Sequence, residues 1–250
     1  MATARTSGSR PSAKKTGKET TTGRRPAGTG RRPAGPAPTT VLLVRHGLTP
    51  TTGTSLPGRA PGLHLSDAGK AQAQAAAERI AQLGNVTAVY ASPLERTRET
   101  AAPISSALGL RTKRDRGLLE CDFGDWTGRN LKDLMKLPEW RTVQRNPSAF
   151  TFPGGESFSA MQARITTAIA GLVAAHPGET IVAVSHADPI KAAVAQSVGT
   201  HLDLFQRIVI SPCSVSAITY PNKPLEHQVN HQCSYLEEAM KKDGNRVHCL

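Results

Sequence analysis

Three short apolar runs, each followed directly by polar residues, constrain the fold more than any other feature of this sequence. VLLV (41–44), VTAVY (86–90) and TIVAVS (180–185) lack the strict alternation of a half-buried strand. Such runs are typical of strands buried on both faces of a parallel sheet, where ligands bind beyond the carboxyl ends of the strands. We therefore expect the polar residues after these runs to meet at one edge of the sheet. They are Arg45 and His46, Ser92 to Arg96, and Ser185 and His186.

Helical segments alternate with these strands. Ser66 is a candidate N-cap for a helix reaching about Leu83, and Ser157 for one ending near His176. Helices are also predicted after Ser92-Pro93 and from about Pro189 to Val198, with a long loop before Ser157. SVSAITY (214–220) alternates in polarity, which predicts a strand at a sheet edge. The order favours an α/β layered fold around a largely parallel sheet.

Composition divides the chain into three parts. Residues 1–38 hold nine Lys or Arg and one Glu, contain none of Leu, Ile, Val, Phe, Trp or Tyr, and repeat TGRRPAG at 22–28 and 29–35. We predict a disordered basic tail (1–38), a folded domain (39–221) and a polar C-terminal extension (222–250). The tail accounts for eight of the twelve net positive charges, and the mildly positive remainder suits an enzyme with anionic substrates.

Several function classes are unsupported by the composition. The sequence has no run of 18 apolar residues and no secretory signal, and its four cysteines are widely spaced, so we expect a cytoplasmic protein with reduced thiols. Three interpretations of the basic tail remain: it is a targeting segment, it binds nucleic acid or another anionic surface weakly, or it is an inert solvated arm. His227 and His231, four residues apart, form a candidate metal pair, but a solvated extension is the better explanation, because the other spacings fit no structural zinc pattern, and we predict no metal site.

The strand-end residues have the chemistry that phosphoryl transfer needs. A neutral imidazole such as His46 is nucleophilic without an activating base. Arg45 and Arg96 offer planar forks for phosphate oxygens, and His186 precedes a helix whose first amides favour an anion. We interpret Arg98 as a surface residue. Three other histidines, His64, His176 and His201, are read as structural or solvated.

The motifs taken together resemble the histidine phosphatase superfamily, whose founding members are the cofactor-dependent phosphoglycerate mutases. LVRHGLT (43–49) is similar to its signature. Further matches in the expected order are LHLSDAGKAQA (63–73), SPLERTRETA (92–101), LLECDFGDWTG (118–128), FPGGES (152–157) and VSHADPIKA (184–192). The resemblance covers residues 41 to about 220 and is nearest to an actinobacterial branch of phosphomutase-like proteins. It implies a three-layer sandwich, with a mostly parallel central sheet and helices on both faces.

The resemblance also implies roles for individual residues. His46 would be phosphorylated, while Arg45, Arg96 and His186 would line the phosphate pocket. Glu120 would protonate the leaving oxygen and then activate water, with no metal or cofactor.

This chain departs from the family at three of its motif positions. Leu48 stands where an acidic residue or glutamine is common, Thr52 replaces an asparagine that touches phosphate, and Ala187 replaces the glycine after the second histidine. We retain Thr52 and Ala187, together with Arg59 in the 47–62 loop, as candidate substrate-binding residues.

The predicted function is hydrolysis of a small phosphorylated metabolite through a phosphohistidine. Two alternatives remain: a phosphomutase of the phosphoglycerate mutase type, and a catalytically weak regulator that binds a phosphorylated ligand. Lys132, Lys136, Arg141 and Arg145 bear on the first alternative, because they would either cover an acidic substrate or form the solvated face of a short helix.

Overall fold

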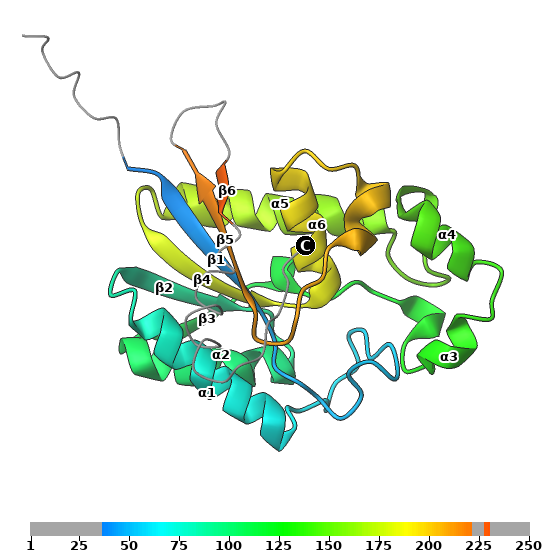
Figure 1. The fold of residues 1–250 in the computed structure, drawn as a ribbon, viewed down its shortest axis with the longest axis horizontal. Coiled ribbons are helices and arrows are strands. Elements are labelled where there is room, and N and C mark those ends of the chain that lie inside the picture. The colour runs from blue at the N-terminus through cyan, green and yellow to red at the C-terminus, as the bar shows by residue number, and fades with distance from the viewer. Residues whose placement is uncertain (1–36, 222–227, 231–250) are drawn as a thin grey trace, which may run out of the picture. The chain divides into compact units, whose positions relative to one another are not determined.

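The computed structural model describes residues 37–221 and 228–230. These residues form a six-stranded sheet in the order β3-β2-β4-β1-β5-β6 (Figure 1). The strands are β1 (Thr39–Arg45), β2 (Val86–Ala91), β3 (Thr112–Arg114), β4 (Thr180–Ser185), β5 (Val215–Tyr220) and β6 (Gln228–Asn230). β3, β2, β4 and β1 run parallel, whereas β5 is antiparallel to β1 and β6 is antiparallel to β5. The prediction of a mostly parallel α/β sheet is confirmed.

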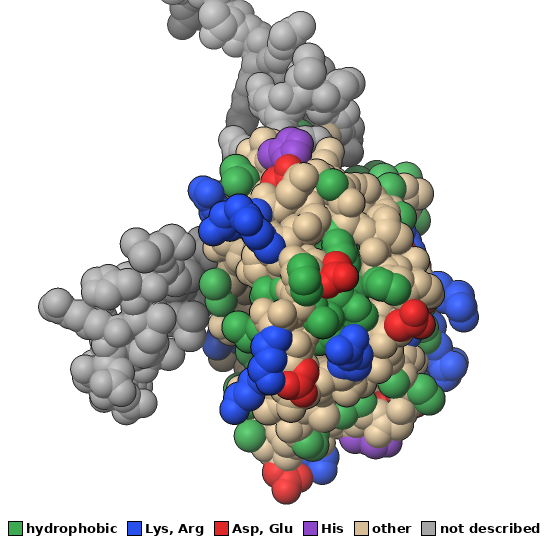
Figure 2. Space-filling model, turned by 90° about the vertical axis from the view of Figure 1, so that its right-hand side faces the viewer, with side chains coloured by type: hydrophobic (Ala, Val, Ile, Leu, Met, Phe, Trp, Pro, Cys, Tyr) green, Lys and Arg blue, Asp and Glu red, His purple; other side chains and the backbone are tan. Residues whose placement is uncertain are grey.

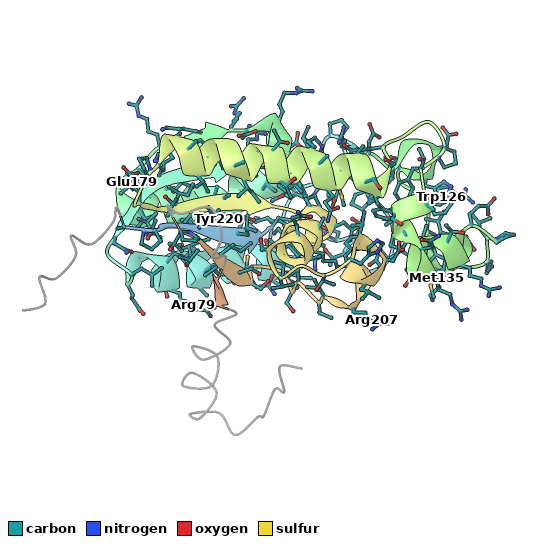
Figure 3. All side chains as sticks on the ribbon, turned by 90° about the horizontal axis from the view of Figure 1, so that it is seen from above. Arg79, Trp126, Met135, Glu179, Arg207 and Tyr220 are labelled. Carbon is teal, nitrogen blue, oxygen red and sulfur yellow. The ribbon has the colours of Figure 1, made fainter. Side chains whose placement is uncertain are left out.

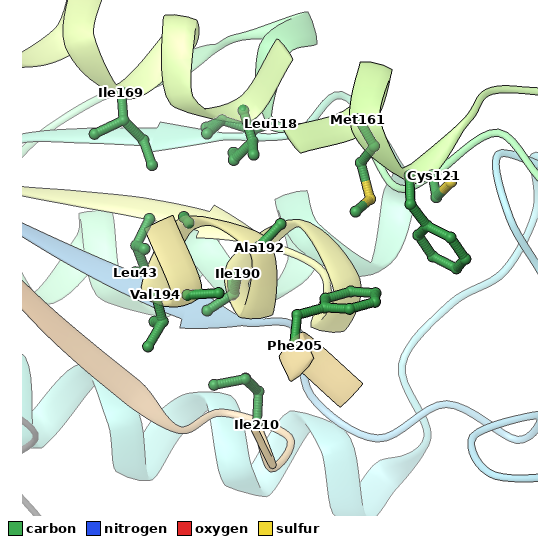
Figure 4. Close-up of a cluster of buried hydrophobic side chains, with 14 of the residues drawn as sticks. Leu43, Leu118, Cys121, Met161, Ile169, Ile190, Ala192, Val194, Phe205 and Ile210 are labelled. Carbon is green, nitrogen blue, oxygen red and sulfur yellow. The ribbon is translucent and has the colours of Figure 1, made fainter. Parts of the chain in front are cut away.

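Helices cover both faces of the sheet. α1 (Asp67–Ala81) and α2 (Glu95–Leu108) cover one face, and α5 (Phe158–Ala175) and α6 (Ala187–Ser197) cover the other. The short helices α3 (Leu131–Leu134) and α4 (Trp140–Arg145) lie beyond the end of the sheet (Figure 1). Leu42 and Val44 of β1 face the core shared with α1 and α2, whereas Val41 and Leu43 face the core under α5 and α6 (Figure 4). Because successive strand residues point to opposite faces, one short apolar strand supplies both cores. The three-layer sandwich is therefore confirmed.

Local sequence signals account for the ends of the main helices. The Ser66 hydroxyl accepts a hydrogen bond from the Gly69 amide at the start of α1, and the Ser157 hydroxyl accepts one from the Ala160 amide at the start of α5. Gly109, with φ 66°, ends α2 in the left-handed conformation that glycine adopts without strain. Both predicted N-caps are confirmed.

Two expectations about the sheet and its connections are wrong. β5 was predicted at a sheet edge, but β6 pairs with it on the side away from β1. β6 lies within residues 222–250, which were predicted as a polar extension without a strand. A strand of three residues carries too short a pattern to be recognised. The predicted long loop contains β3, the short helices α3 and α4, and three 3₁₀ turns. Trp126 and Met135 of this segment lie at the end of the domain opposite Glu179 (Figure 3).

α5 is the one helix in the described residues that is long and apolar enough to cross a membrane, by length and composition alone. One side of this helix is buried against the sheet and α6, as in the core helix of a globular domain. Its buried residues are Phe158, Met161, Ile165, Ile169 and Leu172.

Candidate active site

The carboxyl ends of three adjacent strands bring the predicted polar clusters together. Just beyond β1, the His46 amide donates to the Ser185 carbonyl (3.0 Å), and just beyond β2, the Ser92 amide donates to the Val184 carbonyl (2.9 Å). His46 and His186 consequently lie side by side, with ring centroids 5.3 Å apart. The convergence expected from the three apolar runs is what the sheet produces.

His46 is held as a neutral imidazole with one nitrogen free. Its Nδ1 lies 2.8 Å from the Gly47 carbonyl oxygen. Because a carbonyl only accepts hydrogen bonds, Nδ1 carries the proton, and Nε2 keeps its lone pair. Burial, followed by the positive charges of Arg96 and Arg45, lowers the pKa of His46 to about 3. The imidazole of His46 therefore stays in its neutral form around pH 7, with its one proton on Nδ1.

Close backbone packing fixes the loop that carries His46. The Gly47 amide donates to the Thr100 hydroxyl (3.0 Å), which itself donates to the Arg96 carbonyl (2.7 Å). A Cβ on Gly47 would lie 2.5 Å from the Gly69 carbonyl oxygen, and one on Gly69 would lie 2.0 Å from that of Leu48. Glycine is required at both positions because two backbones meet there without room for a side chain.

Two arginines beside His46 keep cationic donors without a protein acceptor. Arg96 is fully buried, and its Nη2 donates to the Gly58 carbonyl (2.7 Å), while Nε and Nη1 have no partner among the described residues. Arg45 donates from Nη1 to the Ile210 carbonyl (2.6 Å), and its buried Nε is likewise unpaired there. Unpaired buried donors are rare because each costs about 1–3 kcal/mol, and more when charged. Their clustering indicates a place where an anion binds.

Glu120 and His186 face each other in the same buried region. His186 Nε2 lies 2.9 Å from the Ser92 hydroxyl, and its unpaired Nδ1 lies 4.0 Å from Glu120 Oε2. Glu120 Oε1 accepts a hydrogen bond from the Cys121 amide (3.0 Å). Burial, and then the negative charge of Asp188, raises the pKa of Glu120 to about 7. A carboxyl group with this pKa can both donate and accept a proton near neutral pH.

Two arginines on separate elements clamp the segment that bears Glu120. Arg59 Nε and Arg164 Nη2 both donate to the Glu120 carbonyl oxygen, at 2.8 and 3.2 Å. Each also donates to Oε2 of Glu156 at 2.9 Å, so that one carboxylate links the two guanidinium groups. Arg164 binds two further carbonyls of residues 117–119. The third Arg59 nitrogen, Nη1, donates to Asp122 (3.4 Å), so all three of its nitrogens bind protein atoms.

Comparison with known proteins agrees with this geometry. The family model described as histidine phosphatase superfamily (branch 1) matches residues 41–229. This chain belongs to the histidine phosphatase superfamily. It is 31% identical over 183 residues to phosphoserine phosphatase 1 of Hydrogenobacter thermophilus, covering 71% of this chain and 85% of that protein.

Two further relatives are mycobacterial proteins. A bifunctional protein of Mycobacterium tuberculosis is 32% identical over 207 residues, or 80% of this chain and 55% of the relative, so the chain spans little more than half of that protein. A mycobacterial glucosyl-3-phosphoglycerate phosphatase, solved with inorganic phosphate, has a TM-score of 0.63 and 26% identity. The matched region covers 72% of this chain and 88% of the phosphatase. These similarities fit the expected actinobacterial branch.

Two of the remaining candidate residues of this superfamily member, Thr52 and Ala187, occupy different settings. The Thr52 hydroxyl accepts a hydrogen bond from the Thr49 amide (3.0 Å) and lies 2.9 Å from the Thr49 hydroxyl, so it closes a tight turn. Ala187 is the first residue of α6, with His186 at the N-cap position and no side chain bonded to the first amides. The predicted helix start at about Pro189 is thus two residues late, and the true start brings those amides beside His186.

The other histidines fit the expected structural or solvated settings. His64 pairs with Glu99, and His201 is exposed beside Asp203. His176 contacts Tyr90 and Glu179 near the amino ends of β1 and β4, at the opposite end of these strands from His46. Arg98 is exposed, as predicted.

No group of three or more metal-ligating side chains occurs within residues 37–221 and 228–230. The His227 and His231 pair and the basic tail up to residue 36 lie outside the described residues.

Sequence reasoning missed one residue at this site, Arg164. The FPGGES segment draws attention to Glu156, but Arg164 lies two turns into α5 and belongs to none of the recognised motifs. Its one usable signal is an arginine in a helix whose other residues are mainly apolar or small. The structure shows why it is there, because three of its five acceptor atoms are carbonyl oxygens of residues 117–120 and the other two belong to Glu156.

Proposed function

We propose that this chain hydrolyses phosphomonoesters through a phosphohistidine formed on His46. The observation that carries the proposal is the ring of unpaired donors around this residue: Nε and Nη1 of Arg96, Nε of Arg45 and Nδ1 of His186. A phosphoryl group has non-bridging oxygens that would accept these hydrogen bonds. Its negative charge would offset the cost of burying two guanidinium groups.

The first step transfers the phosphoryl group to the enzyme. The lone pair on His46 Nε2 attacks phosphorus, and the bond from phosphorus to the ester oxygen breaks. Arg45 and Arg96 stabilise charge on the non-bridging oxygens as it redistributes. The departing alkoxide takes the proton from the carboxyl group of Glu120, which a pKa of about 7 keeps available at neutral pH.

The second step regenerates the enzyme. Glu120, now a carboxylate, removes a proton from a water molecule as its oxygen attacks the phosphorus of phosphohistidine. The bond from phosphorus to Nε2 breaks, its electron pair returns to the ring, and inorganic phosphate leaves. When the Ser92 hydroxyl donates to His186 Nε2, Nδ1 carries the proton and donates to a phosphoryl oxygen in both steps.

Roles for the other candidates follow from their contacts. Ala187 would contribute a backbone amide at the N-terminus of α6. Arg59, like Arg164, is assigned to positioning Glu120 rather than to substrate contact, since protein atoms occupy its nitrogens. Thr52 is assigned to shaping the loop after His46.

The alternatives make different demands on the site. A regulator that only binds a phosphorylated ligand needs the cations but not a buried carboxyl group with a raised pKa. A phosphoglycerate-type mutase needs additional cations for the carboxylate of its substrate, yet Lys132, Lys136, Arg141 and Arg145 are all exposed. Both observations favour the hydrolase. Cys121 and Cys213 are free thiols, which supports the proposed cytoplasmic location.

The test is turnover of an aryl phosphate between pH 5 and 8 in the presence of EDTA. The wild type is compared with His46→Ala and with a control, His64→Ala, which removes an exposed histidine that pairs with Glu99. We expect activity in the wild type and the control, none in His46→Ala, and acid-labile phosphate on rapidly quenched wild-type protein. Full activity in His46→Ala would refute the proposal. Binding of phosphate without turnover of any phosphomonoester would instead support the regulator.

A further inference from the structure

A cavity of about 180 Å³ lies between the 121–152 segment and α6, at the end of the domain that Figure 2 faces. Hydrophobic side chains gather in the middle of this face, and charged ones lie around them (Figure 2). Seven of the lining residues are apolar: Leu56, Phe123, Leu131, Trp140, Val143, Phe152 and Phe158. The other four lining residues, Gln144, Asp188, Lys191 and Gln206, give the cavity a mixed wall, and its size suits a ligand as large as benzene.

Two lining residues connect the cavity to the phosphoryl site. Asp188 belongs to the first turn of α6, directly after His186 and Ala187, and its charge acts on both Glu120 and Arg45. Phe123 reaches within 3.2 Å of where a Cβ on Gly58 would lie, and the Gly58 carbonyl binds the buried guanidinium of Arg96. The alcohol part of a phosphomonoester seated on His46 would therefore extend into this cavity.

The polar lining residues leave no free positive charge for a second anionic group. Lys191 Nζ donates to Asp188 (3.2 Å) and to the Gln206 side-chain oxygen (3.1 Å), and both charged side chains are more than four-fifths buried. Gln144 and Gln206 are neutral. The basic residues of the neighbouring helices, Lys132, Lys136, Arg141 and Arg145, are exposed and do not line the cavity.

We propose that this cavity selects phosphomonoesters whose alcohol part is apolar, aromatic in particular, and rejects those whose alcohol part carries a carboxylate. The proposal rests on the hydrolase function proposed above and specifies its substrate class. The seven apolar side chains favour contact with a ring, whereas a carboxylate would lose its water next to Asp188 and find the one cation among the lining residues already paired.

The experiment compares three substrates with similar leaving alcohols: ethyl phosphate, 2-phenylethyl phosphate and 2-(4-carboxyphenyl)ethyl phosphate. We expect kcat/KM for the phenyl compound to exceed both others by at least tenfold. Binding of the corresponding phosphonates, measured by calorimetry, should follow the same order. Equal values for all three, or a preference for the carboxylate, would overturn the inference while leaving the hydrolase intact. Selective phosphonate binding without turnover would uphold the cavity and refute the hydrolase.

Two variants connect the selectivity to this cavity. Gln144→Lys adds a free cation at an exposed lining position, so it should raise kcat/KM for the carboxyphenyl compound at least fivefold relative to the phenyl compound. The control, Arg145→Gln, changes the charge of the next residue, which does not line the cavity, and should leave the ratio unchanged. An unchanged ratio in Gln144→Lys, or an equal change in both variants, would place recognition of the alcohol elsewhere.

Discussion

Glu120→Gln should stabilise the protein at neutral pH at the cost of activity. Glutamine has nearly the same shape, and its side-chain oxygen can still accept the hydrogen bond from the Cys121 amide. Burial raises the pKa of Glu120 from 4.5 to about 7, so between these pH values the folded state holds a proton that the unfolded state has released. Stability contributed by this group is therefore present below pH 4.5 and is lost as the pH rises towards 7.

The size of the effect follows from the same shift. At 1.36 kcal/mol per pKa unit, ionisation of Glu120 costs the folded wild type about 3 kcal/mol above pH 7. The variant, having no carboxyl group, escapes this cost. We expect the two proteins to have similar free energies of unfolding at pH 4.5, and the variant to be more stable by about 3 kcal/mol at pH 8.

Urea denaturation of both proteins at intervals from pH 4.5 to 8 measures this difference. The low pKa of His46 also makes stability depend on pH, but it does so in both proteins and largely cancels in the comparison. A difference that is constant with pH, or that grows towards acid, would refute a raised pKa at Glu120. It would also remove the basis for its role as proton donor.

Further predictions concern the framework of the site. Gly69→Ala should lower the free energy of unfolding by about 1–3 kcal/mol in urea denaturation, because its Cβ would lie 2.0 Å from the Leu48 carbonyl oxygen. Gly171→Ala, in α5 with open space around it, should instead raise it by about 0.5–1 kcal/mol, and a loss in both would contradict the assignment of close packing to Gly69. Arg164→Lys keeps the charge but loses the fork that holds the Glu120 segment, so kcat for an alkyl phosphate should fall roughly ten- to a hundredfold with little change in KM. Unchanged kcat would show that this clamp does not position the carboxyl group.

The parts of the site that the sequence predicts are those fixed by strand order and helix caps. His46, Ser92 and His186 each follow an apolar run, and parallel strands place such residues at one edge whatever the intervening chain does. Arg96 is placed at the same edge, because it lies in the first turn of α2, the helix that follows β2. Glu120 is different: it lies in irregular structure, and its placement depends on contacts with Arg164, 44 residues away. Only the resemblance to a family singled it out.

The specificity cavity was beyond sequence reasoning for a related reason. One of its walls comes from α3, α4 and flanking turns, which are too short for a periodic pattern, and aromatic rings of residues 126–152 pack together in this segment. The sequence shows Lys191 three residues after Asp188, but not that both are buried beside the alcohol site. The His186 N-cap and the Asp188–Lys191 pair share the first turns of α6, so one helix both presents donors to the phosphoryl group and neutralises the cavity next to it. Removing Asp188 would therefore alter the ionisation of Glu120 and free Lys191 at once, which couples the pH dependence of the reaction to its choice of substrate.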